Sequence, residues 1–237
     1  MYLIIKRIFD FSSSLLGLII LIPVFLPIII ILKFTGEGEV FYLQKRMGKD
    51  NSFFYIYKFA TMLKDSPNIG TGNHTVRNDP RVTKFGKILR ITKINELPQI
   101  LNVLFGSMTL VGPRPLIEKS FYKYSKEVQD IIYKNKPGIT GLGSLVFRDE
   151  EKLVSAYNDT GGDTFEYYSK FIFPYKGQLE SWYHNNISFL VDLKILFLTF
   201  WSLVDSKSNL VQFWLKDIPQ KPEMLTIEGI LKNKKYE

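Results

Sequence analysis

The chain has 237 residues, and 31 Lys and Arg against 23 Asp and Glu give a formal net charge of +8. A hydrophobic share of 46% and a charged share of 23% exclude a disordered, collagen-like or disulfide-scaffold chain. The absence of cysteine excludes disulfides, thiolate nucleophiles and Cys-ligated zinc, and the two histidines, His74 and His184, argue against a multi-histidine metal site. A basic chain with 15% aromatic residues favours nucleic acid or an anionic membrane surface as partner.

The first predicted element is an apolar run at residues 15–32, which reads LLGLIILIPVFLPIIIIL and contains no charge. Its length is at the lower limit of a transmembrane helix, which needs roughly 20 residues. Pro23 and Pro27 each remove a backbone donor, so we expect the helix to break there. Basic residues flank both ends, which places both ends on the cytoplasmic side. These features favour a re-entrant hairpin over a spanning helix, a cleaved signal peptide or a soluble core helix.

Short strands and a loop are predicted next. Residues 36–48 have the pattern of a turn, a short strand and a basic loop, and residues 53–59 that of an aromatic strand. Residues 65–79 are predicted to form a polar loop. An Asn-His-Thr sequon at residues 73–75 lies in it, which a cytoplasmic domain would not expose to the glycosylating enzyme. Apolar spacing then predicts a helix over residues 82–90.

A further helix is predicted to begin at Asn95 and to end at Gly106. Asn95 can cap this helix, and the carboxylate of Glu96 suits the positive end of its dipole. Residues 111–115 then read VGPRP, which is a rigid loop with one arginine.

Basic residues gather around one carboxylate, Glu96, in this part of the chain. Arginine forks match phosphate oxygens bidentately, and Mg²⁺ is usually bound by one or two carboxylates together with substrate oxygens. The pattern therefore predicts a Mg²⁺-dependent pyrophosphate site, although a solvated basic helix face has the same charge. The basic residues are Arg81, Lys84, Lys87, Arg90 and Arg114.

The last third of the chain predicts surface and interfacial elements. Residues 171–180 are aromatic and are expected at a membrane interface. Residues 187–204 are mostly apolar, but Asp192 and Lys194 would make membrane crossing costly. We therefore expect a helix that lies in the interface or packs on the hairpin. The end of the chain is expected to be a polar, Lys-rich tail.

Several segments together indicate a family, and they cover about residues 6–204. Besides the Pro-broken apolar run they are KRIFD at 6–10, QKRMG at 44–48, KFATM at 58–62, NDPRVTKFGKILR at 78–90, NELPQILNVL at 95–104, LVGPRP at 110–115, PGITG at 137–141 and DLKIL at 192–196. With these segments in this order, the sequence resembles the monotopic phosphoglycosyl transferases. They are the bacterial sugar transferase family that starts glycan assembly on polyprenyl phosphate. The combination is much more specific than any single segment.

The resemblance implies an α-rich α/β fold: a small cytoplasmic domain with an N-terminal re-entrant membrane helix and interfacial amphipathic helices. We expect the re-entrant helix at residues 1–35, the transferase domain at 36–206 and a C-terminal extension at 207–237. The length is typical of a minimal transferase core without further N-terminal membrane helices.

The resemblance also implies an activity, namely transfer of a sugar-1-phosphate from a UDP-sugar to polyprenyl (undecaprenyl) phosphate with Mg²⁺. The expected place is the cytoplasmic face of the bacterial inner membrane, in capsule, lipopolysaccharide or other glycan biosynthesis. Glu96 matches the metal-binding residue of the family. The predicted substrate-binding residues are Lys58, Arg81, Arg90 and Arg114. Nucleic acid is not an expected partner, because no recognisable nucleic-acid module occurs; a homodimer stays open.

Asn95 departs from the family at its most important position. The family has an Asp there, which attacks the sugar-linked phosphate, and an amide cannot form that phosphoryl-aspartate. Ala60, Ile22 and Ser107 replace an Arg, a Ser and an Asp of the family pattern.

Asn95 and Glu96 stay the predicted catalytic pair, with four alternatives for Asn95. Polyprenyl phosphate attacks the UDP-sugar directly, or Glu96 or Asp79 is the nucleophile. In the third alternative the chain is an inactive member that binds ligand or a partner transferase. In the fourth, Asn95 is deamidated or an engineered inactivating substitution.

Overall fold

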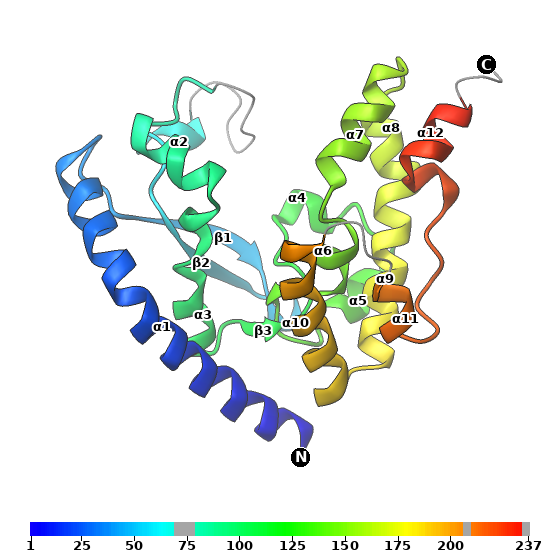
Figure 1. Cartoon of the computed structure of the whole chain (residues 1–237), viewed down its shortest axis with the longest axis horizontal. Coiled ribbons are helices and arrows are strands. Elements are labelled where there is room, and N and C mark those ends of the chain that lie inside the picture. Colours follow the sequence, from blue (N-terminus) through cyan, green and yellow to red (C-terminus); the bar gives the residue numbers. More distant parts are fainter. Residues whose placement is uncertain (69–78, 206–209, 234–237) are drawn as a thin grey trace. The chain divides into compact units, whose positions relative to one another are not determined.

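The structure is a computed structural model that describes residues 1–68, 79–205 and 210–233. It is helix-rich with small sheets (Figure 1), so the predicted α-rich α/β class is confirmed, whereas its membrane features stay predictions. Two compact units share the chain. The α1–α3 unit comprises Arg7–Arg46 and Phe54–Met108, and the α4–α12 unit comprises Met1–Lys6, Met47–Phe53 and Thr109–Glu237. These units are defined by contacts between residues. The division of the chain by function, into residues 1–35, 36–206 and 207–237, stays a prediction.

Most of the regular elements are short helices and strands, and α1, with 33 residues, is the long exception. In the first half of the chain they are α1 (Tyr2–Phe34), β1 (Phe41–Met47), η1 (Lys49–Asn51), β2 (Phe53–Phe59), η2 (Ser66–Asn68), α2 (Lys84–Ile91), η3 (Ile94–Glu96), α3 (Gln99–Phe105) and β3 (Thr109–Val111). The second half contains α4 (Glu118–Phe121), α5 (Lys126–Ile132), β4 (Gly138–Thr140), α6 (Leu142–Val146), α7 (Glu150–Asp159), α8 (Thr164–Tyr167), η4 (Tyr168–Ile172), α9 (Phe173–Asn185), α10 (Phe189–Val204), α11 (Leu210–Trp214), η5 (Glu223–Leu225) and α12 (Ile227–Asn233).

Helix α1 runs unbroken through Pro23 and Pro27, although it changes direction along its course (Figure 1). The sequence predicted two arms there. Packing explains the continuity, because Phe25 and Ile28 are buried against the α1–α3 unit and hold the turns on both sides of Pro27. Within the described residues, α1 alone has the length and composition to cross a membrane. Whether it enters the bilayer as a re-entrant element stays a prediction.

The segments that bound the site are partly as predicted. Strand β2 covers the expected residues 53–59, whereas Lys45 and Arg46 belong to strand β1 and not to a basic loop. Helix α2 matches its prediction closely and is capped by Thr83, whose Oγ1 accepts a hydrogen bond from the Gly86 amide at 3.0 Å. The predicted sequon lies outside the described residues.

Helix α3 begins four residues later than predicted. Asn95 lies inside the 3₁₀ turn η3 and is not the cap of α3. The C-terminus is at Gly106 as predicted, where φ is +85°, a conformation that glycine adopts without strain. Arg7 from α1 donates hydrogen bonds to the carbonyl oxygens of Val103 and Leu104 at 2.7 and 2.8 Å. This guanidinium thus supplies hydrogen-bond donors to carbonyl groups in the last turn of α3.

In the α4–α12 unit, strands β3 and β4 pair in parallel, with Thr109 opposite Gly138 and Val111 opposite Thr140. The pairing brings the LVGPRP and PGITG motifs together. A Cβ atom on Gly138 would lie 2.1 Å from the backbone nitrogen of Gly112, so this close approach requires glycine.

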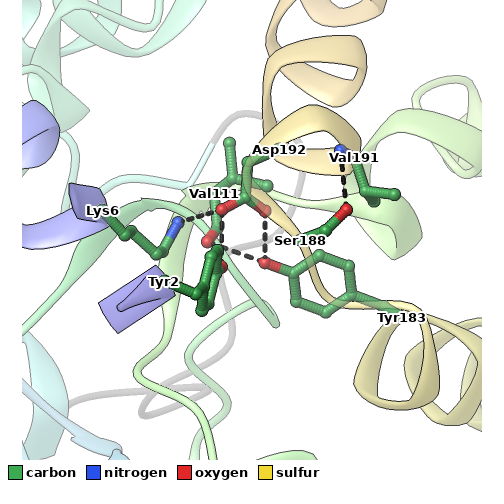
Figure 2. A network of polar contacts seen from close by, with 7 residues as sticks. All are labelled: Tyr2, Lys6, Val111, Tyr183, Ser188, Val191 and Asp192. Atoms are coloured by element: carbon green, nitrogen blue, oxygen red, sulfur yellow. Dashed lines mark hydrogen bonds and ion pairs between the residues drawn. The ribbon is translucent and has the colours of Figure 1, made fainter. Parts of the chain in front are cut away.

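A polar network surrounds Asp192 in helix α10 (Figure 2). Its Oδ2 accepts hydrogen bonds from Lys6 Nζ at 2.6 Å and Tyr2 OH at 2.7 Å, and its Oδ1 from Tyr183 OH at 2.7 Å. Lys194 instead donates to the carbonyl oxygen of Trp214. The two charges of the apolar α10 are therefore satisfied by the protein.

The C-terminal segment is folded as far as the structure describes it, so the predicted polar tail is wrong there. Leu225 and Ile230 are 0% and 2% exposed and belong to the core of the α4–α12 unit. Tyr167 donates a hydrogen bond to the Met224 carbonyl at 2.7 Å. The prediction from composition failed because a few buried apolar residues are spaced among many lysines.

Candidate active site

A pocket of about 500 Å³ lies in the α1–α3 unit. Both strands β1 and β2, the segment after β2, the end of α2 and the turn η3 contribute to its lining. Its described lining has five cationic and two carboxylate side chains, so the pocket is suited to an anion. The cations are Arg46, Lys58, Lys64, Arg90 and Lys93, and the carboxylates are Glu39 and Glu96.

Four of the predicted site residues line this one pocket: Lys58, Arg90, Asn95 and Glu96. They are as much as 38 positions apart in the sequence. Lys58 is on β2, Arg90 is in the last turn of α2, and the other two are in η3. Lys93 has a φ of +60°, and this left-handed residue makes the tight turn that leads from α2 into η3.

Lys58 and Glu96 form an ion pair, with Nζ and Oε1 2.8 Å apart. Their side chains are 15% and 35% exposed, so the pair is partly open to the pocket. The neighbouring Phe59 is 1% exposed and packs in the core of the unit. Side chains alternate along a strand, so Lys58 and Phe59 are on opposite faces of β2, and both residues contribute to the lining.

Arg90 donates a hydrogen bond to Thr61 Oγ1 at 3.3 Å. Thr61 follows Ala60, and both residues line the pocket. Alanine therefore stands where a family arginine would add a further cation, and Arg46, Lys64 and Lys93 supply cations to the pocket that the sequence analysis did not predict as site residues.

Asn95 is buried, with 9% of its surface exposed. Its Oδ1 accepts no hydrogen bond from the described residues. A buried acceptor without a donor is uncommon in folded proteins and costs stability. The site therefore contains a polar atom that the described chain does not satisfy.

Asn102 connects β2, which contributes Lys58, with α3, the helix that follows the turn containing Glu96. Its Oδ1 accepts a hydrogen bond from the Tyr57 amide at 2.9 Å, and its Nδ2 donates to the Tyr55 carbonyl at 2.8 Å. The side chain thus pairs α3 with the backbone of β2. The sequence analysis missed this residue, although a polar side chain beside the apolar face of a helix is a usable signal.

Arg81 is not among the residues that line the pocket. It is 5% exposed, and its Nε and Nη2 donate to Asp79 Oδ1 and Oδ2 at 2.9 and 2.6 Å, while Nη1 donates to the carbonyl of Ser66 at 2.7 Å. These contacts hold the loop that contributes Ser66 to the pocket. Asp79 is buried in the same pair, which leaves it poorly suited to act as a nucleophile.

Arg114 belongs to the other unit, where its side chain is exposed. Tyr133 OH donates to the Arg114 carbonyl at 2.7 Å and accepts from the Leu116 amide at 2.8 Å. The loop after β3 is thus held by one buried tyrosine, and its rigidity stays a prediction.

Hard oxygen donors that could hold a metal ion are few in this pocket. Glu96 and Glu39 offer carboxylates, of which Glu39 is paired with Lys64 at 2.7 Å, and Asn95 offers an amide oxygen. No group of three metal-ligating side chains occurs within the described ranges. The donor set fits Mg²⁺, which commonly takes one or two protein carboxylates and completes its shell with substrate oxygens and water.

Comparison with known proteins places this geometry in context. The family model described as Bacterial sugar transferase matches residues 1–206. A UDP-glucose:undecaprenyl-phosphate glucose-1-phosphate transferase from Klebsiella pneumoniae is 37% identical over 200 residues, which are 83% of this chain and 39% of the relative. An undecaprenyl-phosphate galactose phosphotransferase from Salmonella typhimurium is 34% identical over 210 residues, with 82% and 39% covered. The exopolysaccharide production protein ExoY of Sinorhizobium fredii is 31% identical over 208 residues, with 82% and 83% covered. The chain thus spans about two fifths of the two longer relatives.

Proposed function

Because the chain belongs to the bacterial sugar transferase family, we propose that it transfers a sugar-1-phosphate from a UDP-sugar to undecaprenyl phosphate. This reaction would start the assembly of a surface polysaccharide. The names of the Klebsiella and Salmonella relatives support the lipid acceptor and the transferred phospho-sugar. Those two relatives differ in their sugar, so the donor must be found with a panel of UDP-sugars.

The cationic pocket is the observation that carries this proposal. Five cations face two carboxylates in its described lining, and one carboxylate, Glu96, is paired with Lys58. The diphosphate of a UDP-sugar has the opposite charge. Arg90 offers a fork that matches two phosphate oxygens, and Lys58 offers a compact point charge.

Glu96 is the residue we propose to hold Mg²⁺. A bound Mg²⁺ would neutralise charge on the diphosphate oxygens during transfer. Lys58 fixes the orientation of the Glu96 carboxylate through Oε1. The ammonium group also balances the charge of the Glu96 carboxylate.

We propose direct displacement, because Asn95 has no nucleophilic carboxylate. An oxygen of undecaprenyl phosphate attacks the sugar-linked phosphorus, and the bond from that phosphorus to the bridging oxygen breaks. UMP leaves with the bridging oxygen and its electron pair. Lys58 and Arg90 stabilise the charge that moves onto UMP, which is how such transfers are mainly catalysed.

The apolar helix α1 supports a place at a membrane, where a polyprenyl acceptor is found. Many of its large apolar side chains are exposed, including Ile19 and Ile20 at 57% and 64%. Such a surface favours lipid contact. We propose the cytoplasmic face of the bacterial inner membrane, since both flanks of the apolar run are basic.

A second candidate function is an inactive family member that binds a UDP-sugar or a partner transferase. Asn95 in place of the family's nucleophile favours it. The two candidates share the same pocket and differ in turnover. They are therefore separated by product formation and not by binding.

The test is UMP release by the purified full-length chain with undecaprenyl phosphate, Mg²⁺ and a panel of UDP-sugars. We expect UMP with at least one sugar, and much less from a Glu96→Gln variant, which loses the carboxylate. Absence of UMP with every donor, although UDP-sugars bind, would overturn the transferase in favour of the inactive member.

A further inference from the structure

The unsatisfied Oδ1 of Asn95 restricts the kind of ligand that fits the pocket. This oxygen is buried and accepts no hydrogen bond from the described residues, and the residue that carries it lines the pocket. Its two nearest chain neighbours offer no remedy, since Glu96 is a carboxylate and Ile94 is apolar. A buried acceptor of this kind needs a donor, and a ligand can supply one.

A diphosphate satisfies the cations of the pocket but not this oxygen. Phosphate oxygens near neutral pH act as acceptors, so they pair with Lys58, Arg90 and their cationic neighbours. Oδ1 requires an O–H or N–H group. A ligand that satisfies both requirements must therefore carry a diphosphate and a neutral donor close to it.

We propose that Oδ1 of Asn95 accepts a hydrogen bond from a hydroxyl group of the sugar in the bound UDP-sugar. This inference rests on the proposed function. The sugar is joined directly to one phosphate, so its hydroxyls lie next to the groups that Lys58 and Arg90 bind. The other donors of a UDP-sugar, the ribose hydroxyls and the uracil N–H, are on the side of the other phosphate and are also present in UDP, so a comparison with UDP separates them from the sugar hydroxyls. Asn95 thus recognises the donor sugar and distinguishes a UDP-sugar from UDP.

The proposal gives Asn95 a role that does not depend on a covalent intermediate. An amide cannot be phosphorylated as an aspartate can, but its oxygen is a good neutral acceptor. Since the amide carries no charge, its oxygen accepts a hydrogen bond from the hydroxyl group without repelling the phosphates. A pocket with asparagine at position 95 should therefore bind the intact UDP-sugar tightly.

The test is calorimetric titration of the full-length chain in detergent, without undecaprenyl phosphate so that no transfer occurs. UDP and UDP-glucose or UDP-galactose are compared, each with Mg²⁺ and with EDTA. We expect one UDP-sugar to bind more tightly than UDP. Asn95→Ala should lower the affinity for that UDP-sugar about tenfold and leave the affinity for UDP nearly unchanged. Asn95→Leu, which keeps the side-chain volume, replaces the alanine variant if that one does not fold.

Gln44→Ala is the matched control, because it removes another amide from the same lining. It should affect UDP and the UDP-sugar alike. Equal losses for both ligands in Asn95→Ala would overturn the inference, and so would a loss seen only with Mg²⁺, which would make Oδ1 a metal ligand. No binding of UDP or any UDP-sugar by the wild type would overturn the proposed function as well.

Discussion

At the scale of single residues, the side chain at position 95 decides between direct displacement and a covalent route. It lines the pocket together with Lys58, Arg90 and Glu96. We predict that Asn95→Asp raises the rate of UMP release by at least about tenfold, because it provides the carboxylate that a covalent route needs in a pocket that already contains the cations. The rate is measured at saturating UDP-sugar and acceptor. An unchanged rate in a folded variant would mean that the pocket does not support the covalent step.

Glu180 should make stability depend on pH. Burial raises its pKa from 4.5 to about 7, although the charge of Lys176 opposes the shift. The folded chain therefore keeps a proton that the unfolded chain loses between these pH values. The contribution of Glu180 to the free energy of unfolding is fully present below pH 4.5 and is lost as the pH rises toward 7.

A neutral glutamine at position 180 mimics the protonated acid. Glu180→Gln should match the wild type near pH 4 and exceed it near pH 8, by about 2–3 kcal/mol in the free energy of unfolding. Denaturant titrations at both pH values measure this. Glu151→Gln, at an exposed position, is the control and should show no such difference. Equal stability of Glu180→Gln and wild type at pH 8 would contradict the assignment.

The sequence predicted several residues that line this pocket, because they belong to short motifs. Lys58, Arg90 and Glu96 were predicted and do line one pocket. Arg81 was predicted from charge alone, and its guanidinium is instead held by Asp79 and the Ser66 carbonyl. Charge does not reveal whether a cation already has a partner, and this depends on contacts that only the fold creates.

At the scale of elements, the C-terminal extension should be required for folding. The family model ends at residue 206, yet Leu225 beyond it is fully buried in the core of the α4–α12 unit. Leu225→Ala should lower the free energy of unfolding by about 2–5 kcal/mol, because it leaves a cavity. Leu231 lies in the same extension but is 53% exposed, so Leu231→Ala should change little. Similar effects of the two substitutions, measured by denaturation in detergent, would contradict this packing.

The start of α1 and helix α10 are joined by one buried ion pair. Lys6 and Asp192 have side-chain exposures of 11% and 4%. Lys6→Met should destabilise the chain by about 3–5 kcal/mol, because Asp192 would keep a buried charge without its cation. Lys126→Met breaks the exposed pair with Asp130 and should cost less than about 1 kcal/mol. Adding Asp192→Leu to Lys6→Met should recover part of the loss, and no recovery would contradict this account.

Elements with strong local signals were predicted well. Helix α2 has its Thr83 cap and apolar spacing, and strand β2 is a run of aromatic residues. Strands β3 and β4 were missed because each has only three residues and depends on a partner about 30 positions away. Helix α9 was expected at an interface, but Tyr175 and Leu179 are buried in the core. Aromatic composition does not distinguish a membrane interface from a protein interior.

At the scale of the whole molecule, we propose that the formal net charge of +8 serves two purposes. Part of it flanks the apolar run at residues 15–32, where basic residues suit an anionic membrane surface. Another part lines the pocket of the α1–α3 unit, where it suits a diphosphate. Net charge from the sequence could indicate an anionic partner. The division between membrane and ligand is already predicted by the order of the basic residues along the chain, and the fold adds which of them line one pocket.

The most direct test of the central claim follows the sugar-linked phosphate. The full-length chain is supplied with undecaprenyl phosphate and a UDP-sugar whose sugar-linked phosphate contains ³²P. We predict that the label moves into the lipid fraction while UMP is released, and that Arg90→Met reduces both. Transfer of the sugar with the label left behind in UDP would contradict sugar-1-phosphate transfer by this chain.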